Sequence, residues 1–332
     1  MDIDHYQDEA YKTEQPYMSS DDKDKLIVPL LGLAGESGEL LAEYKKKMRD
    51  GGDHLHFDKR VREELGDLLW YIANIATKFN LKLSDIASFN LKKTQDRWGK
   101  SPDGVSAPNF DADFSDEEKI PRQFSVHIFD CIYKGEQETM GFCNGVPLGD
   151  RLTDNVTDDD GYRFHDAFHL GYAAVLGWSP VTRYTLGVKR KSSKDFDQNQ
   201  DGGRAIAIEE GISALVYSYA ENHKFLAEAT ALDYSLLRTI KDLTSKYEVK
   251  ALSSSDWQRA ILLGFKVWRP LNEHKSGLIH VDLDKGTMEF ERPLTDEEKT
   301  ALVDSYPEAK EKRKKDQAER KARLLAKRKA KV

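Results

Sequence analysis

Two acidic pairs, each with a spacing of three residues, constrain the fold of this chain more than any other feature. Glu36 and Glu39 lie in the stretch GESGEL, and Glu64 and Asp67 lie in REELGDLLW. Residues three apart share one face of a helix, so each pair would place two carboxylates side by side. Both stretches also carry apolar residues at helical spacing, which predicts two long helices. Glu64 and Asp67 would lie at the edge of an apolar stripe, and Glu36 and Glu39 would lie on an arc away from the apolar residues of their helix.

Clustered carboxylates repel one another unless divalent cations bridge them, and Mg²⁺ prefers hard oxygen ligands of this kind. Two facing helices with such pairs would form a magnesium site that can seat a polyphosphate. An isolated ExxE motif usually lies on a solvated helix face. Here the same helices also carry glycines, which are tolerated where helices approach closely or a ligand needs room. These glycines are Gly32, Gly35, Gly38 and Gly66.

Composition places the chain among soluble globular proteins. Its 332 residues suffice for about two domains, and 33% are charged and 39% hydrophobic. The apolar stretch 26–34 is too short to span a bilayer, and the acidic start lacks the regions of a secretory signal. We therefore expect a cytoplasmic protein with no membrane partner. Cys131 and Cys143, the only cysteines, form no CxxC pair and are expected to be buried thiols.

The charge is distributed unevenly along the chain. Residues 309–332 hold 12 Lys and Arg against 3 acids, a net charge of +9. Because the whole chain has a net charge of −7, residues 1–308 together carry −16. An acidic body argues against a nucleic-acid groove in the main domains and suits a protein that gathers metal cations. The basic tail can bind RNA, an anionic membrane or an acidic neighbour, or it can simply aid solubility, which is the default interpretation.

The hydrophobic pattern predicts a mainly α fold with two domains. Residues 1–98 indicate one short and three longer helices, the material of a four-helix arrangement, with Asp58 and Ser84 as expected N-caps. Residues 99–122 are rich in Pro, Gly, Ser and acids, which is typical of a linker.

A second domain is expected over residues 123–300, mostly helical but mixed α+β, with a small β element and no assigned role. Alternation at residues 124–128 predicts a strand, and Asp284-Lys285-Gly286 predicts the turn of a hairpin over 277–292. Helical patterns occur near 160–177, 203–223, 229–246 and 255–268. A basic tail is expected over 307–332.

Four blocks of the first domain occur in a specific order over about residues 3–98. They are HYQDEAYKT, LLGLAGESGEL, EELGDLLWYIANIA and NLKKTQDRW. Together they resemble the all-α nucleoside triphosphate pyrophosphohydrolases, and specifically the MazG-like group. The resemblance implies that Mg²⁺, for which Mn²⁺ can substitute, is held by Glu36, Glu39, Glu64 and Asp67.

The same resemblance implies a set of nucleotide contacts. It implies that Asn90, Lys93 and Arg97 touch the phosphates or the sugar. Trp70 and Tyr71 are candidates for contact with the base, and packing in an aromatic core is the alternative.

The activity implied by the resemblance is Mg²⁺-dependent hydrolysis of a nucleoside triphosphate to a nucleoside monophosphate and pyrophosphate. Such an enzyme would serve nucleotide-pool control, house-cleaning, stress or phage defence. A carboxylate that binds no metal could accept the proton of the attacking water, and Glu43 and Glu63 are the options. Proteins of this type usually complete their core by pairing, so a homodimer or higher homo-oligomer is expected.

Two alternative functions stay open. The enzyme could act on another nucleotide, such as phosphoribosyl-ATP or an alarmone. From a different class, the first domain could be a nucleotide-binding sensor whose second domain is the effector.

The second domain contains a separate candidate cluster. The stretch RFHDAFHLG places His165 and His169 one helical turn apart with Asp166 between them, and Glu209 and Glu210 follow in IEEGISAL. Two histidines at this spacing with a glutamate suit Zn²⁺ or another transition metal. The alternative is a hydrogen-bonded helix pair in the core.

Overall fold

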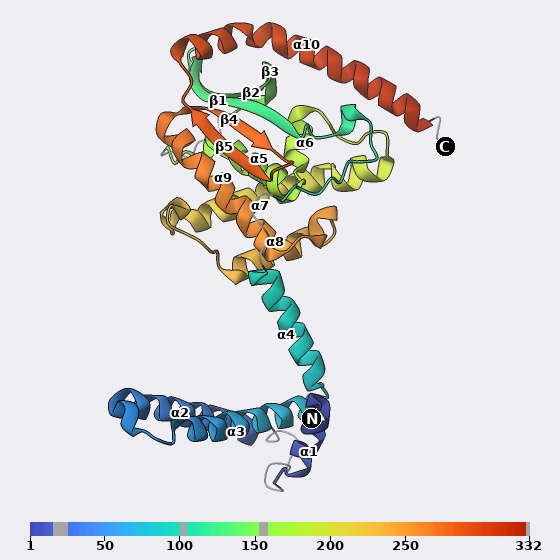
Figure 1. Cartoon of the computed structure of the whole chain (residues 1–332). Coiled ribbons are helices and arrows are strands. Elements are labelled where there is room, and N and C mark those ends of the chain that lie inside the picture. Colours follow the sequence, from blue (N-terminus) through green and yellow to red (C-terminus); the bar gives the residue numbers. More distant parts are fainter. Residues whose placement is uncertain (16–25, 100–104, 153–158, 330–332) are drawn as a thin grey trace. The chain divides into compact units, whose positions relative to one another are not determined.

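The computed structural model describes residues 1–15, 26–99, 105–152 and 159–329. The chain divides into two compact units, Met1–Gln95 and Asp96–Val332. Helices dominate both units, and a five-stranded antiparallel sheet lies in the second (Figure 1). The mainly helical fold class expected from the hydrophobic pattern is confirmed.

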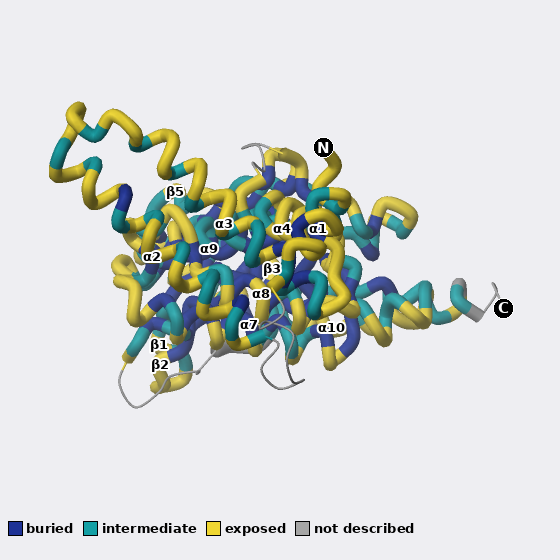
Figure 2. The backbone as a smooth tube through the Cα atoms, turned by 90° about the horizontal axis from the view of Figure 1, so that it is seen from below, coloured by how far each residue is buried: buried dark blue, intermediate teal, exposed yellow. Residues whose placement is uncertain are grey.

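The N-terminal unit is built on an antiparallel pair of long helices. These are α2 (Ile27–Asp50) and α3 (Phe57–Lys78), and α1 (Ile3–Lys12) packs on α3. The small core joins α1, α3 and the start of α4 (Leu83–Trp98), whose last residues belong to the second unit. In α2 only Pro29 and Glu43 are buried, and colouring the backbone by burial shows how much of this unit is exposed (Figure 2).

Hydrogen bonds from α1 define where α4 begins. The Gln7 amide donates to the Leu81 carbonyl at 2.8 Å, and its oxygen accepts the Leu83 N–H at 2.8 Å. The Asp4 carboxylate accepts the backbone N–H and the hydroxyl of Ser84 at 2.9 and 2.7 Å. Ser84 was expected to be the N-cap, but it lies inside the first turn, and a carboxylate from another helix satisfies its N–H instead.

The turn between α2 and α3 is fixed by Glu43. This buried carboxylate accepts hydrogen bonds from Lys46 Nζ at 2.5 Å and His54 Nε2 at 2.9 Å. The helix α3 then begins at Phe57. Asp58, expected as its N-cap, lies in the first turn, where a negative charge still complements the positive end of the helix dipole.

The sheet of the C-terminal unit has the strand order β3-β2-β1-β4-β5, and all neighbours are antiparallel. The expected strand at 124–128 is part of β1, and the expected hairpin is formed by β4 and β5. The hairpin of β2 and β3 was not expected. The strands are β1 (Gln123–Tyr133), β2 (Glu136–Cys143), β3 (Val146–Leu152), β4 (Ser276–Asp282) and β5 (Thr287–Arg292).

One face of this sheet packs on helices. The helix α5 (Asp166–Leu176) is almost wholly buried and lies against α9 (Ser254–His274), which also contacts β4 and β5. The two helices approach closely at Gly171, which has no side chain. A Cβ at this position would lie only 3.0–3.2 Å from the backbone of Ala260 and Gly264. The core also includes residues of α7 (Gly203–Glu221) and α8 (Tyr234–Thr244), and Leu186 of α6 (Pro180–Leu186) packs against it.

The other face of the sheet is covered by α10 (Asp296–Lys329), which runs along β1 and β3 (Figure 1). Phe129 and Phe142 form a second core there with Tyr306 of α10. Further along, Arg313 donates to the Gly149 carbonyl at 3.1 Å, and Leu324 is buried. Residues 307–329 of the expected basic tail are therefore part of one helix that packs on the unit, and the rest of that expected tail lies outside the described residues.

The segment that precedes β1 also packs on the C-terminal unit. Asp111 is buried, and its carboxylate accepts hydrogen bonds from Arg183 at 2.6 Å and from the Ile120 N–H at 2.9 Å. The Ala107 N–H donates to the Leu283 carbonyl at 2.7 Å. Residues 105–122, assigned to a linker from their composition, thus extend this unit.

The start of α10 yields a testable electrostatic prediction. Both oxygens of Glu298 accept hydrogen bonds from Arg292 at 2.7 and 2.8 Å, and the Thr295 N–H donates to the same carboxylate at 2.8 Å. The guanidinium, followed by the N–H, lowers the pKa of Glu298 to about 2. The ordinary value is about 4.3, so this contact stabilises the fold above pH 4.3 and is lost as the pH falls toward 2.

Carboxyl-carbon NMR of the folded protein should find Glu298 titrating near 2, and Arg292→Gln should return it toward its ordinary range. A pKa of about 4.3 for Glu298 in the wild type would contradict the contact.

Within the described part of the chain, no helix combines the length and the hydropathy needed to cross a membrane. Cys143 is buried and Cys131 is half-buried, and no disulfide links them. Burial raises the pKa of the Cys143 thiol to about 11, so this thiol stays protonated at neutral pH.

Candidate functional site

The contact between α2 and α3 determines which acidic residues meet. A side chain on Gly32 would overlap the ring of Tyr71, so glycine lets this ring pack directly on α2. One turn beyond Gly32, α2 brings Glu36 beside the acidic pair of α3.

Three of the four expected ligands converge. Carboxylate oxygens of Glu36, Glu64 and Asp67 all lie within 4.8 Å of one another. Glu36 and Glu64 are half-buried, and Asp67 is exposed. Glu39 is exposed and is not among these three, although its charge acts on Glu64. The structure therefore forms a three-carboxylate cluster with a fourth acid next to it.

The electrostatics of this cluster favour a cation. Burial raises the pKa of Glu64, and the negative charges of Glu36, Asp67 and Glu39 raise it further. A positive ion between the oxygens would relieve both effects. The donor set consists of carboxylate oxygens, so it fits a hard divalent ion such as Mg²⁺ or Mn²⁺.

The two aromatic residues that follow Asp67 are engaged in packing. Trp70 lies against the core of α1 and α3, and its Nε1 donates to the Thr13 hydroxyl at 2.7 Å. Tyr71 packs over Gly32 and stands edge-on to Trp70, with 4.9 Å between the ring centroids. Both rings therefore help to hold the helices together, and their contact with a base stays a prediction.

The three polar residues expected to touch the nucleotide lie along α4. Asn90 and Lys93 are exposed on the part that belongs to the N-terminal unit. Arg97 belongs to the C-terminal unit, where its guanidinium lies 4.6 Å from the ring centroid of Trp98 and 5.3 Å from that of Tyr234. Their nucleotide contacts stay predictions.

The two candidate proton acceptors already have cationic partners. Hydrogen bonding by Lys46 holds the pKa of Glu43 below its usual range despite burial, and His54 adds to this effect. Glu63 accepts a hydrogen bond from Arg60 at 2.9 Å on the exposed face of α3. Both acids are therefore committed to ion pairs in this arrangement.

A second cluster lies in the C-terminal unit between the start of α5 and α7. His165 and His169 are both buried, and ligand atoms of these residues and Asp166 lie within 4.8 Å of one another. Glu210 Oε2 lies 3.5 Å from His165 Nε2 and 3.3 Å from His169 Nε2. The structure thus brings together all the members of the candidate site in this domain.

Glu209 is fully buried and anchors this cluster from the inside. It accepts hydrogen bonds from His169 Nδ1 at 2.9 Å, the Ser179 hydroxyl at 2.5 Å and the Val181 N–H at 2.8 Å. Burial alone would lower the pKa of His169, but the charges of Glu209 and Glu210 outweigh it and raise the pKa to about 10. These carboxylates therefore favour a positive charge between them.

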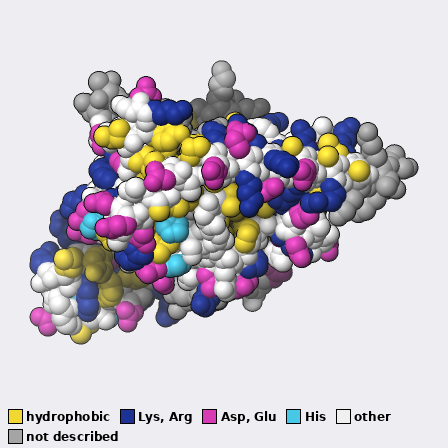
Figure 3. Space-filling model, turned by 90° about the horizontal axis from the view of Figure 1, so that it is seen from above, with side chains coloured by type: hydrophobic (Ala, Val, Ile, Leu, Met, Phe, Trp, Pro, Cys, Tyr) yellow, Lys and Arg dark blue, Asp and Glu magenta, His cyan; other side chains and the backbone are white. Residues whose placement is uncertain are grey.

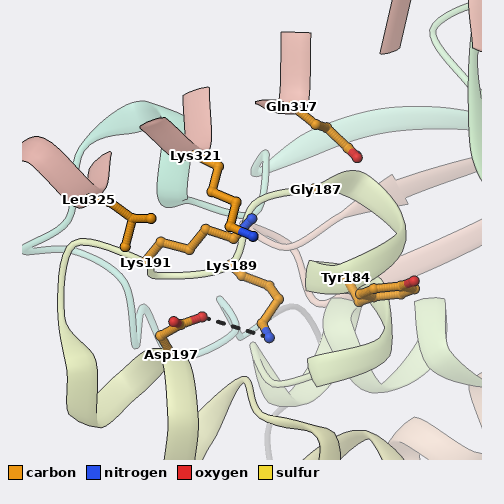
Figure 4. A pocket seen from close by; sticks show the side chains of 8 residues that line it. All are labelled: Tyr184, Gly187, Lys189, Lys191, Asp197, Gln317, Lys321 and Leu325. Carbon is orange, nitrogen blue, oxygen red and sulfur yellow. Dashed lines mark ion pairs between the residues drawn. The ribbon is translucent and has the colours of Figure 1, made fainter. Parts of the chain in front are cut away.

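Sequence reasoning missed one feature, a pocket of about 290 Å³ beside α10 (Figure 4). Lys189, Lys191 and Lys321 reach into it, and Lys189 pairs with Asp197 at 3.7 Å. Burial lowers the pKa of Lys191, and so does the charge of Lys321. The run Val188-Lys-Arg-Lys191 was the available signal. Figure 3 looks onto α10 and shows basic side chains mixed with acidic ones on this face.

Comparison with known proteins gives two family matches. Residues 28–100 match the MazG nucleotide pyrophosphohydrolase domain, and residues 105–294 match the MazG C-terminal domain. The "Gene 37 protein" of Mycobacterium phage L5 is 38% identical over 69 residues, which are 20% of this chain and 60% of that protein. The chain thus covers less than two thirds of this relative's length. No solved structure matches.

Proposed function

This chain belongs to the MazG family, and we propose that its N-terminal domain hydrolyses a nucleoside triphosphate to a nucleoside monophosphate and pyrophosphate in the presence of Mg²⁺. The observation that carries the proposal is the convergence of Glu36, Glu64 and Asp67 on the α2–α3 pair. Their shared negative charge is unfavourable without a cation. A nucleoside triphosphate that binds together with divalent cations would bring the positive charge that these carboxylates need.

The roles of the residues follow from their positions. Glu36, Glu64 and Asp67 would hold Mg²⁺, with Glu39 close enough to contribute its charge. When bound, the ion supplies counter-charge to the triphosphate and a water of lowered pKa. Lys93 on the exposed part of α4 is proposed to bind phosphate. In the balanced reaction, water oxygen joins the α-phosphorus and the bond to the bridging oxygen breaks, so pyrophosphate leaves with that oxygen.

A turnover screen of the full chain tests the proposal. A panel of ribo- and deoxynucleoside triphosphates, phosphoribosyl-ATP and an alarmone is incubated with Mg²⁺, and pyrophosphate is measured separately from orthophosphate. We expect equal amounts of monophosphate and pyrophosphate from at least one triphosphate, and no product in excess EDTA. In H₂¹⁸O the label should enter the monophosphate, because water attacks the α-phosphorus.

The other outcomes separate the alternatives. Release of orthophosphate alone, or activity that persists in EDTA, would contradict the proposal. Turnover restricted to phosphoribosyl-ATP or the alarmone would assign a different substrate to the same site. Tight binding without turnover of any nucleotide would favour a sensor whose second domain is the effector.

We also propose that the N-terminal unit associates with a second copy of itself. Large apolar side chains of α2, α3 and α4 are exposed, with Leu31 66%, Leu41 70% and Phe89 72% accessible. Apolar surface on helices of this length is normally buried in an interface. Sedimentation equilibrium of the full chain should give a multiple of 37.9 kDa, and a monomer at micromolar concentration would rule the association out.

A further inference from the structure

Three electron-pair donors face one another between α5 and α7. The histidines His165 and His169 lie one turn apart, and both direct Nε2 toward the same oxygen of Glu210. The distances from Oε2 are 3.5 Å to His165 Nε2 and 3.3 Å to His169 Nε2. The His165 and His169 side chains are 6% and 2% exposed, so both rings are shielded from solvent, while the Glu210 side chain reaches the surface.

Each histidine is oriented through its other nitrogen. His165 Nδ1 lies 2.9 Å from the Tyr162 carbonyl, and His169 Nδ1 lies 2.9 Å from the Glu209 carboxylate. Both partners only accept hydrogen bonds, so each Nδ1 carries a proton and Nε2 is the nitrogen of each ring that can give a lone pair to a metal ion in place of its proton. His169 Nε2 has no hydrogen-bond partner although it is buried.

The distances from Glu210 Oε2 to the two Nε2 atoms distinguish direct hydrogen bonds from shared binding of a metal ion. A charge-assisted N–H···O bond between an imidazolium and a carboxylate is about 2.7–2.9 Å long. Two ligand atoms about 2.1 Å from a tetrahedral ion are instead about 3.4 Å apart. The observed 3.3 and 3.5 Å match the spacing of two ligands on one ion better than that of hydrogen bonds.

We propose that His165, His169 and Glu210 bind one divalent transition-metal ion of the zinc or iron(II) class. The Tyr162 carbonyl and the Glu209 carboxylate act as the outer partners that such histidines normally have. Two imidazoles and one carboxylate leave a coordination position for water or a ligand, which is typical of catalytic rather than structural sites. Asp166 is close enough to add a fourth oxygen. The site is independent of the Mg²⁺ site proposed for the N-terminal unit.

Metal analysis of the full chain tests this site. Untagged protein is stripped of metal, dialysed and titrated with Zn²⁺, and a parallel sample is loaded with Co²⁺. We expect one tightly bound ion per chain and visible Co²⁺ absorption of a four- or five-coordinate site. Both should persist in a Glu64→Gln, Asp67→Asn variant, because that variant removes acids of the other cluster only.

Matched variants identify the ligands. Glu210→Gln, at a side chain that is 40% exposed, and His165→Gln should each weaken Zn²⁺ binding at least about 10-fold. Glu221→Gln on the same helix and His223→Gln, whose Nδ1 also bonds a backbone carbonyl, should bind like the wild type.

Two results would overturn the proposal. One is the absence of stoichiometric Zn²⁺ binding and of the Co²⁺ spectrum in the wild type, which decides the matter even if a variant fails to fold. The other is wild-type affinity in a folded Glu210→Gln protein. Either result would mean that protons on the histidines, not a metal ion, neutralise Glu209 and Glu210.

Discussion

Replacing Asp67 by asparagine should reduce pyrophosphate release on the order of 100- to 1000-fold, the loss typical when one charge-stabilising group is removed from an active site. Asp67 lies within 4.8 Å of both Glu36 and Glu64 through its carboxylate oxygens. The amide keeps the size of the side chain but removes a negative ligand, so the triphosphate and its cations lose counter-charge. Steady-state assays with saturating Mg²⁺ measure the effect.

The fold should survive this change, because Asp67 adds to the repulsion that raises the pKa of Glu64. Circular dichroism and sedimentation should therefore match the wild type. Asp58→Asn is the matched control, since Asp58 is an exposed acid in the first turn of the same helix. Near-normal turnover of a folded Asp67→Asn protein would remove Asp67 from the site.

Replacing Arg190 by methionine should destabilise the C-terminal unit by about 3–5 kcal/mol, the usual cost of removing one partner from a buried ion pair. Arg190 is fully buried, and its guanidinium donates to Asp201 at 2.6 Å and to Glu248 at 2.7 Å. It also donates to the Phe110 carbonyl at 3.0 Å. Without it, the buried charge of Asp201 keeps only the longer ion pair with Arg183 at 3.8 Å.

Urea denaturation followed by the fluorescence of buried tryptophans, such as Trp257 and Trp268, measures this loss. Lys224→Ala is the control, because Lys224 pairs with Glu228 at 3.9 Å and both side chains are at least 80% exposed. Exposed pairs contribute about 0–1 kcal/mol, so the control should change little. A comparable small effect for Arg190→Met would mean that the buried network adds little net stability.

The N-terminal helices were predictable because their signals are local. Acidic pairs and apolar periodicity depend on residues within one or two turns, and Asp58, the expected N-cap, lies one residue after the observed start of α3. The register between the helices is not local, because it depends on Tyr71 packing over Gly32. Such contacts between α2 and α3 determine which acids converge, and no periodicity along one helix can reveal them.

The sheet was predictable only in part. The hairpin of β4 and β5 has a local turn signal, but β1 lies beside β4, with Val126 opposite Ile279. Pairing between segments so distant in sequence leaves no local pattern. The helix α5 was expected from the helical pattern near 160–177, but its burial on almost every side follows only from its packing in the C-terminal unit.

The second cluster shows the same limit. The spacing of His165 and His169 is visible in the sequence, whereas the different roles of Glu209 and Glu210 are not. Adjacent residues on a helix point about 100° apart, so one reaches Ser179 in the core and the other faces both Nε2 atoms. Only the packing of α7 against α5 and α6 assigns these roles.

The helix α10 lies outside the family match but is part of the folded C-terminal unit. The matched C-terminal region ends at residue 294, and α10 begins at Asp296. A fragment that ends with the match would keep every matched residue but would bare Phe129 and Phe142, which Tyr306 now helps to cover. An apolar sheet face in water attracts other chains, so such a fragment should aggregate. The smallest soluble form of this unit is therefore set by α10.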